Sequence, residues 1–485
     1  MKLNNKEFFK ISFLYTAVAA FPPFLNLFVR PLIEGEGKLG PGDFSQIEIT
    51  ETIITLAFII ATFAMNNAIS RFYYDYTDNK KGYNKLVSGI FNFILLRGLV
   101  LLVIAYVFRD LIGQIFSQPE LQDFSKYGFA AIITGMNRAI NMTAFALYRN
   151  EKKVRRFLIL SIILGILRSV FQLIGVFYYD MSFIGYVYGN LIGSSIVTIV
   201  ILVYTYNKSG FHIDRKILSP VNQFALPLFE YSIIVWGINF ADRYFLESAP
   251  TALGIYSQAL LMGRGIEIIL QGLQGASQPE MFRFMKDGFE KNMGEIKKLS
   301  HLLMAQSQLI IALAILPAMA YCLIFKTELR LASGLIAIVF IRYIQRMQYT
   351  VFSFPVYFEK KTKVFLYLNL VVLGLNLLFL YFLVPLYGIY GAVAAMLITQ
   401  TIQVFGIFIY QQRLVKISWN MNKVMVYPII IIILTVLLEI INVQYGLNEF
   451  ASAAVVVAII FLSLVLLYKR ELINVINELR VRLKF

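Results

Sequence analysis

The sequence predicts an all-α integral membrane protein built from two similar halves. Of its 485 residues, 59% are hydrophobic, whereas soluble domains are nearer 45–50% apolar. The apolar residues gather in long blocks, and a block of about 20 residues spans a bilayer as a helix. Several motifs also recur at a nearly constant offset. Together these observations predict two parallel six-helix bundles with a central cavity, plus two extra C-terminal helices.

The apolar blocks predict fourteen transmembrane helices, and the loops between them alternate sharply in lysine and arginine content. Because basic loops stay in the cytoplasm, this alternation places both termini there. We therefore expect a multi-pass membrane protein. The expected spans are about 9–31, 44–70, 86–108, 126–148, 155–178, 182–206, 222–246, 252–280, 299–325, 329–357, 364–386, 388–411, 423–442 and 449–468.

The two ends of the chain fit this topology. The first ten residues are polar and basic, and the apolar run after them is too long for a signal-peptide core. We expect this run to be a retained first helix. The tail from Glu471 to Phe485 alternates apolar and basic residues. It is predicted to be an amphipathic helix on the cytoplasmic surface.

An internal duplication follows from motifs that recur in the same order. Arg138 is followed thirteen residues later by Glu-Lys-Lys (151–153), and Arg346 is followed thirteen residues later by Glu-Lys-Lys (359–361). A second pair of motifs, at 45–75 and 257–287, supports the repeat. The repeat unit is six spans, an even number, so both halves should share one orientation. We expect bundles at 1–208 and 209–414, with two further spans and the tail at 415–485.

Charged residues within the predicted spans mark candidate functional positions. A charge facing lipid costs at least about 2.5 kcal/mol, so such residues should face a wet interior or a partner. Guanidinium groups suit phosphate because their donors form a fork that binds two oxygens. The candidate substrate-binding arginines are Arg30, Arg97, Arg138, Arg168, Arg243, Arg264, Arg342 and Arg346.

These arginines could also have purely structural roles. Some are expected to tie helices together rather than line a cavity. Arg30 and Arg243 lie near the outer ends of their helices, where snorkelling to the interface is an equal alternative. Acidic counterparts are few, and Arg264 and Glu267 are one helical turn apart, close enough to neutralise each other. The candidates for ion coupling are Glu230, Asp242 and Glu267.

The sequence argues against enzymatic chemistry. It contains two histidines and one cysteine, and it lacks HExxH, GxSxG, GxGxxG and P-loop patterns. We expect no catalytic residue, metal or cofactor. The net charge is +16, but most of this charge lies in loops between apolar blocks. It therefore reflects topology, and no nucleic-acid partner is expected.

Two stretches of sequence resemble Wzx-type polysaccharide flippases of the MOP superfamily. The stretch at 39–44, Leu-Gly-Pro-Gly-Asp-Phe, is similar to the LGP-x-DF/Y pattern of the first loop in that family. The Asp-Arg-Tyr-Phe-Leu at 242–246 and the Leu-Gly-Ile-Tyr-Ser at 253–257 resemble its seventh and eighth spans. The resemblance implies a protein of the bacterial cytoplasmic (inner) membrane that moves an undecaprenyl-diphosphate-linked oligosaccharide from the inner to the outer leaflet. It also implies a cationic cavity for the diphosphate and a groove for the lipid tail made by the last two spans.

The expected partners are therefore an anionic lipid-linked oligosaccharide, membrane lipids, a coupled H⁺ or Na⁺, and glycan polymerase or glycosyltransferase machinery. One alternative is a cation or drug:ion antiporter of the same superfamily, which predicts carboxylates in the cavity. The other is a membrane polysaccharide polymerase or acyltransferase. Polymerases need a long external loop and acyltransferases a conspicuous histidine, and the sequence favours neither.

Overall fold

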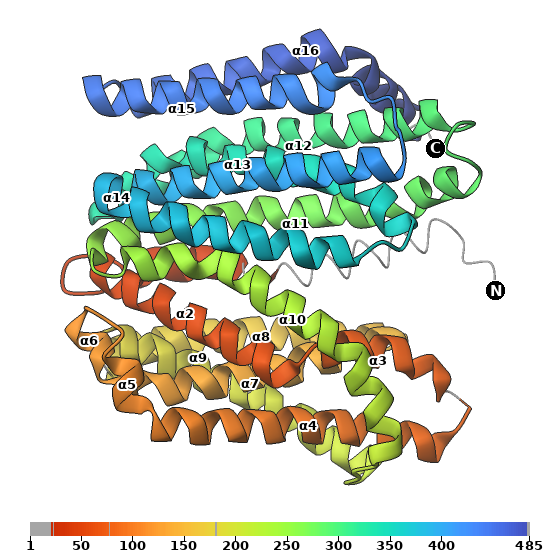
Figure 1. The fold of residues 1–485 in the computed structure, drawn as a ribbon. Coiled ribbons are helices and arrows are strands. Elements are labelled where there is room, and N and C mark those ends of the chain that lie inside the picture. Colours follow the sequence, from red (N-terminus) through yellow and green to blue (C-terminus); the bar gives the residue numbers. More distant parts are fainter. Residues whose placement is uncertain (1–20, 23, 77, 180–181, 483–485) are drawn as a thin grey trace. The chain divides into compact units, whose positions relative to one another are not determined.

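The computed structural model describes residues 21–482 except 23, 77, 180 and 181, and it describes side chains up to residue 469. Within these residues the regular secondary structure is helical, and the single isolated bridge joins Glu34 to Leu39. The predicted all-α class is therefore confirmed. The chain forms two compact units, Met1–Gly254 and Ile255–Phe485, each built of long helices (Figure 1).

Ten helices in the described part of the chain are long and apolar enough to cross a membrane. One of them, the 52-residue α14 (Lys363–Leu414), is interrupted at Gly388, whose φ of 55° and ψ of −126° are not helical. It therefore supplies two of the predicted spans. Two further helices, α7 (Phe124–Asn150) and α13 (Ala332–Phe358), have 27 residues each, about 40 Å of helix, but are not among the ten. The multi-pass class is confirmed, and the count of fourteen stays a prediction.

Unit 1 is organised around α7, most of whose residues are buried. This helix packs against α2, α3, α4 and α9. Gly135 allows α7 to approach α2 closely, because a Cβ there would lie 2.6 Å from the carbonyl oxygen of Ile54. The helices of this unit are α2 (Pro41–Thr62), α3 (Met65–Phe72), α4 (Lys80–Val107), α5 (Arg109–Gly113), α6 (Pro119–Gln122), α7, α8 (Val154–Ile174), α9 (Phe183–Ser209) and α10 (Arg215–Leu246).

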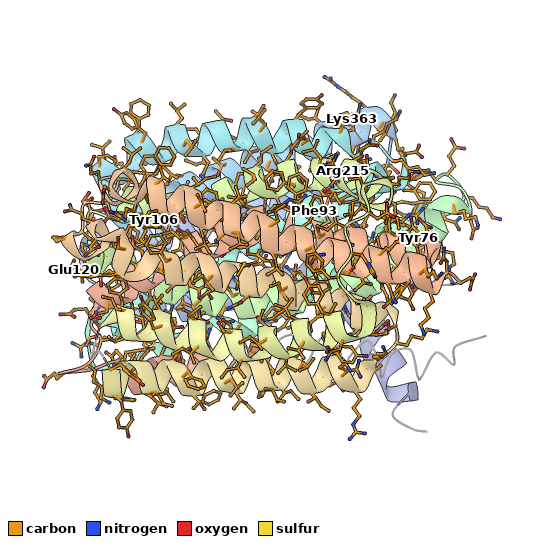
Figure 2. The ribbon with its side chains drawn as sticks, turned by 90° about the horizontal axis from the view of Figure 1, so that it is seen from below. Tyr76, Phe93, Tyr106, Glu120, Arg215 and Lys363 are labelled. Carbon is orange, nitrogen blue, oxygen red and sulfur yellow. The ribbon has the colours of Figure 1, made fainter. Side chains whose placement is uncertain are left out.

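The last helix of unit 1, α10, packs against α2, α3 and α4. The sequence analysis assigned this segment to the second bundle, and that three-part division stays a prediction. Figure 2 shows Tyr76 and Glu120 at opposite ends of unit 1, with Phe93 of α4 between them. The helices of this unit therefore run between two separate polar ends, as membrane helices do.

Unit 2 is organised around α13, which packs against α12, α14, α15 and α16. Like α7, it is buried along most of its length. The two C-terminal helices, α15 and α16, pack against each other. The amphipathic surface predicted for the tail involves side chains outside the described residues. The helices of this unit are α11 (Pro250–Lys286), which begins at the end of unit 1, α12 (Met293–Cys322), α13, α14, α15 (Tyr427–Tyr445) and α16 (Glu449–Arg482).

The predicted duplication extends to the backbone. The bounds of α7 and α13 differ by 208 residues at both ends, which is the offset between Arg138 and Arg346. Both helices end in the same turn. The amide of Lys153 donates to the carbonyl of Tyr148 at 2.9 Å, and the equivalent bond from residue 361 to residue 356 is 3.1 Å. Lys152 and Lys360 occupy the left-handed region, with φ of 55° and 57°.

The turn after α7 is held by Glu151. Its carboxylate accepts hydrogen bonds from Tyr83 of α4 at 2.5 Å, from Lys153 at 2.6 Å and from Lys208 of α9 at 2.8 Å. Burial opposes ionisation of this carboxylate, but the hydrogen bonds from Lys153, Lys208 and Tyr83 outweigh burial and hold its pKa below the usual 4.5. The Glu-Lys-Lys motif therefore fixes three helices at one end of unit 1.

The lowered pKa of Glu151 makes a pH-dependent contribution to stability. This contribution is fully present above the unfolded pKa of about 4.5 and is lost as the pH falls through the lower folded pKa. We expect the Glu151→Gln variant to unfold at a lower temperature than the wild type at pH 7. The difference should shrink as the pH falls below about 4.5. Thermal unfolding of the detergent-solubilised protein across pH 3–7 tests this. A difference that stays constant with pH would contradict it.

The left-handed turn residues give a second test. An L-residue in the left-handed region costs about 1–2 kcal/mol, whereas glycine costs about 0.5–1 kcal/mol through backbone entropy. We expect Lys360→Gly to raise the free energy of unfolding by roughly 0.5 kcal/mol. Lys361→Gly is the control, because residue 361 does not have a positive φ, and it should lower stability. Equal losses in the two variants, measured by thermal unfolding, would show that the turn is not strained.

Candidate functional site

A cavity of about 270 Å³ in unit 1 contains three arginines. These are Arg138 of α7, Arg149 at the end of the same helix, and Arg168 of α8. No aspartate or glutamate is among the thirteen described residues that line the cavity. Its lining therefore carries positive charge. The remaining lining residues are Pro22, Ile54, Thr134, Asn141, Met142, Phe145, Phe157, Ser161, Leu164 and Ser194.

Two of these arginines converge on Glu51 of α2. The Glu51 carboxylate lies 3.8 Å from the guanidinium of Arg138 and 3.9 Å from that of Arg168. Arg138 also donates to the hydroxyl of Thr55 at 3.3 Å, and Arg168 donates to the side-chain oxygen of Asn190 at 2.7 Å. The side chains of Glu51, Arg138 and Arg168 are 15%, 37% and 21% exposed. The group is thus accessible, and its ion pairs are longer than the 2.7–2.9 Å of a direct charged hydrogen bond.

Helix packing holds this group in place. Glu51 and Thr55 are one turn apart on α2, so they present their side chains on the same face. Gly193 of α9 sets the position of Arg168, because a Cβ at residue 193 would lie 2.7 Å from the backbone of Arg168. A larger residue there would push α8, and with it the arginine, away from α9.

Unit 2 carries a related arrangement. The guanidinium of Arg346 on α13 lies 3.0 Å from the carboxylate of Glu267 on α11. Glu267 is 212 residues after Thr55, the offset of the second motif pair, so Arg138 and Arg346 contact equivalent positions. Arg342, one turn before Arg346, donates to the hydroxyl of Tyr343 at 2.8 Å and contacts the sulfur of Met396 at 2.9 Å. The sequence analysis did not assign Arg346 as the partner of Glu267, although it placed both among the candidates, with Arg264 on the same helix.

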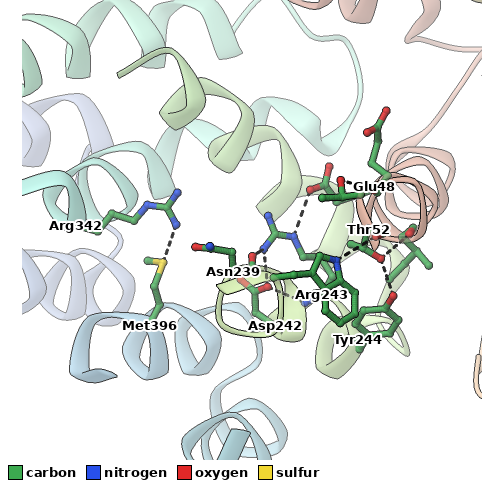
Figure 3. Close-up of polar contacts among 12 residues, drawn as sticks. Glu48, Thr52, Asn239, Asp242, Arg243, Tyr244, Arg342 and Met396 are labelled. Atoms are coloured by element: carbon green, nitrogen blue, oxygen red, sulfur yellow. Dashed lines mark hydrogen bonds and ion pairs between the residues drawn. The ribbon is translucent and has the colours of Figure 1, made fainter. Parts of the chain in front are cut away.

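Arg30 and Arg243 belong to a second, buried cluster in unit 1. Arg243 of α10 lies 3.3 Å from the carboxylate of Glu48 and 2.6 Å from that of Asp242. It also donates to the backbone carbonyl of Asn239. Figure 3 shows its guanidinium directed at Glu48, on the neighbouring helix α2. Arg30 lies 4.0 Å from the same carboxylate. Both arginines are 5% exposed, so the snorkelling alternative is wrong for them.

The same face of α10 makes further bonds to α2. The hydroxyl groups of Thr52 and Tyr244 lie 2.7 Å apart, and the indole of Trp236 donates to the carbonyl of Thr52 at 3.2 Å. This network, with the Glu48 cluster, fixes α10 against α2 (Figure 3). Buried polar groups thereby join α10, the seventh predicted span, to α2, the second.

The remaining candidates occupy different surroundings. Arg97 of α4 donates to the side chain of Asn222 on α10 at 2.7 Å and lies over the ring of Phe63 at 4.3 Å. This is the helix-tying role that the sequence analysis kept open. Asp242 is buried beside Arg243, whereas Glu230 is exposed on α10. Asp242 and Glu230 therefore occupy different surroundings on α10, and the role of the three acidic candidates in ion coupling stays a prediction.

The sequence analysis missed Glu48 and Glu51. Both lie within the second predicted span, so the charge scan that selected the arginines had the signal to find them. Their spacing of three residues places them on one side of a helix. The statement that acidic counterparts are few therefore needs correction, because two of the arginine clusters in unit 1 each contain one of these carboxylates. Thr55 and Asn190 carry no charge, so the search for charged residues within the spans could not have found them.

Known proteins show the same architecture. The fold matches lipid II flippase MurJ in an inward closed conformation with a TM-score of 0.69 and 15% identity, over 95% of this chain and 100% of that one. It also matches a multidrug resistance MATE family transporter of the MOP superfamily in an inward-facing conformation. The TM-score is 0.61 and the identity 14%, over 83% of this chain and 97% of that one. It also matches a MOP superfamily transporter from Pyrococcus furiosus, whose binding pocket is described as having reverse polarity. That match has a TM-score of 0.58 and 13% sequence identity, and it covers 83% of this chain and 95% of that one.

The sequence comparisons add the family. No curated protein matches the sequence. The model of the family described as "polysaccharide biosynthesis protein" matches residues 39–340, well over half of the chain. The family match and the shared fold both agree with the resemblance on which the sequence analysis rested. The chain belongs to the polysaccharide biosynthesis protein family.

Proposed function

We propose that the protein is a flippase that moves an undecaprenyl-diphosphate-linked oligosaccharide from the cytoplasmic to the outer leaflet. The cargo is an O-antigen, capsule or exopolysaccharide unit, and the mechanism is alternating access. The observation that carries the proposal is the cavity in unit 1, which is lined by Arg138, Arg149 and Arg168 and by no carboxylate among its described lining residues. The family match supports a role in polysaccharide biosynthesis.

The chemistry of the cavity fits a diphosphate. Guanidinium groups bind phosphate oxygens through paired donors, and three of them around one space offer more donors than a monoanion needs. The volume of about 270 Å³ is below the range of roughly 300–1,000 Å³ for ligand pockets. The cavity therefore suits the charged head of the lipid carrier, and the sugars and polyprenyl tail extend beyond it.

Glu51 has a specific role in this mechanism. In the empty protein it is the counter-ion of Arg138 and Arg168, through contacts of 3.8 and 3.9 Å. An arriving diphosphate competes with this carboxylate for the same guanidinium groups. When the cargo leaves, Glu51 takes its place, so the arginines are never left in the membrane without a counter-ion.

Transport in this direction has favourable energetics. The membrane potential is negative inside, so two negative charges moving outward gain roughly 4–5 kcal/mol per 100 mV. Coupling to H⁺ or Na⁺ remains part of the proposal, with Glu230, Asp242 and Glu267 as candidate groups. The organic-cation antiporter is the less favoured function, because it requires carboxylates where this cavity presents arginines. The protein then acts as a transporter rather than an enzyme, and glycan polymerases or glycosyltransferases act before or after it.

Loss of the two arginines that converge on Glu51, or of Arg346, the counterpart of Arg138 in unit 2, should reduce export. We expect Arg138→Gln, Arg168→Gln and Arg346→Gln each to reduce surface glycan at least tenfold in a strain that lacks the chromosomal gene, since each removes a charged hydrogen bond worth about 1.5–3 kcal/mol. Arg71→Gln is the matched control, because Arg71 forms an exposed pair with Asp75 one turn away. Lectin staining of intact cells measures the outcome. Normal staining in the Arg138 and Arg168 variants, at equal protein level, would refute the role of the cavity.

Neutralising Glu51 should separate binding from turnover. Glu51→Gln removes the competitor of the diphosphate, so the purified protein should bind undecaprenyl diphosphate more tightly than the wild type. Release should become slower, so glycan export should fall although binding improves. Tryptophan fluorescence titration of the detergent-solubilised protein and lectin staining of cells provide the two measurements. Weaker binding together with lower export would mean that Glu51 only positions the arginines.

A further inference from the structure

A second cavity, of about 600 Å³, lies in unit 1 at the turn between α7 and α8. Its polar side consists of Lys152, Lys153, Arg155 and Arg156, and no acidic residue is among its described lining residues. The other side is aliphatic and includes Ile159 of α8 and Val200 of α9. We call this feature the basic groove. It is separate from the cavity around Arg138, because the two share no lining residue.

The positive charge of the basic groove is only partly cancelled locally. Glu151 pairs with one of its cations, Lys153, at 2.6 Å, and its carboxylate also accepts from Lys208 and Tyr83. Lys152 and Arg155 are exposed. The groove thus presents several cations to whatever occupies it, and charge complementarity demands an anion.

Arg156 provides a fixed donor within the groove. Its guanidinium lies over the ring of Tyr204 at 4.0 Å and over that of Tyr148 at 5.7 Å. The two rings hold the planar group in one orientation. Its Nη1 atom is buried and has no hydrogen-bond partner. Other buried side-chain atoms of the described residues, among them Nη1 of Arg97, also lack a partner, but the one on Arg156 belongs to a residue that lines a basic cavity, where a phosphate oxygen would complete it.

The internal repeat shows that the turn itself does not require this arrangement. The equivalent turn after α13 has the same backbone hydrogen bonds and the same left-handed lysine. At the offset of 208, however, Tyr148 corresponds to Val356 and Arg156 to Val364. The arginine and the tyrosine beneath it are therefore additions to unit 1 rather than parts of the shared fold.

The aliphatic side identifies the class of anion. Beyond the groove, α8 and α9 expose large apolar side chains along their length, among them Ile163, Ile166, Ile196 and Val203. In a membrane protein such a surface faces lipid. An occupant with an anionic head at Arg156 and hydrocarbon chains along these helices satisfies both sides of the groove. The basic loops also place this turn on the side of the membrane where anionic lipids attract cations.

We propose that the basic groove binds the phosphate head group of an anionic phospholipid, with its acyl chains lying along α8 and α9. This lipid is a bound component of the protein and not its cargo. It ties the turn after α7, and so the helix that carries Arg138, to the leaflet surface. The inference goes beyond the proposed function, because lipid retention is independent of glycan export.

Native mass spectrometry of the full-length protein, with phosphatidylglycerol or phosphatidylcholine added in detergent, tests the proposal. Wild type should retain phosphatidylglycerol and little phosphatidylcholine. Arg156→Gln should bind phosphatidylglycerol about tenfold more weakly, the effect of losing one charged hydrogen bond. The double variant Lys152→Gln/Arg155→Gln alters only exposed side chains and should weaken binding similarly. Lys363→Gln, at the position equivalent to Arg155 in unit 2, is the matched control and should bind as wild type does.

Two results would overturn the proposal. Equal retention of both lipids, or equal retention of phosphatidylglycerol by wild type and all variants, would mean that the groove does not recognise a phosphate head group. Displacement of phosphatidylglycerol by an equimolar amount of undecaprenyl diphosphate would assign the groove to the cargo instead of a resident lipid. Persistence of phosphatidylglycerol in the presence of that competitor supports the resident lipid.

Discussion

The organisation of unit 1 depends on two carboxylates of α2 that neutralise arginines within a membrane-embedded bundle. A guanidinium facing hydrocarbon is costly, so it needs a counter-ion or water. Glu48 meets this need for Arg30 and Arg243 in a buried cluster with a contact of 3.3 Å to Arg243. Glu51 does so for Arg138 and Arg168 at longer range and with more exposure. One turn of α2 thus carries a buried ionic link to α10 and, beside it, a longer and more exposed one to α7 and α8.

The two halves share a backbone but not a charge pattern. Position 55 of unit 1 is threonine, and its equivalent in unit 2 is Glu267, which pairs with Arg346. Position 51 of unit 1 is glutamate, and at the same offset unit 2 has Gly263, against which the hydroxyl of Tyr343 packs closely. The duplication therefore supplies two copies of an arginine on a central helix, and the neighbouring helix decides which counter-ion each one has.

The fold was more predictable from sequence than the site. Motif spacing located both copies of the central helix, and the bounds of α7 and α13 reproduce its offset of 208 residues. The apolar blocks of the sequence included these two helices, at 126–148 and 329–357, although neither is among the ten of the described chain that are long and apolar enough to cross a membrane. The alternation of basic loops agreed with their assignment as spans. The roles of Thr55 and Asn190 as hydrogen-bond partners of the arginines could not be predicted from sequence. A neutral polar residue in a span shows its partner only once the packing of the neighbouring helix is known.

The low apolarity of α7 is itself a consequence of its position. A helix surrounded by α2, α3, α4 and α9 does not meet lipid, so it can carry polar residues that an outer helix cannot. This is why the cavity arginine lies there. Three guanidinium groups, from Arg138, Arg149 and Arg168, line the cavity, and no carboxylate is among its described lining residues. The lining is therefore complementary in charge to an anion, whereas it would repel an organic cation.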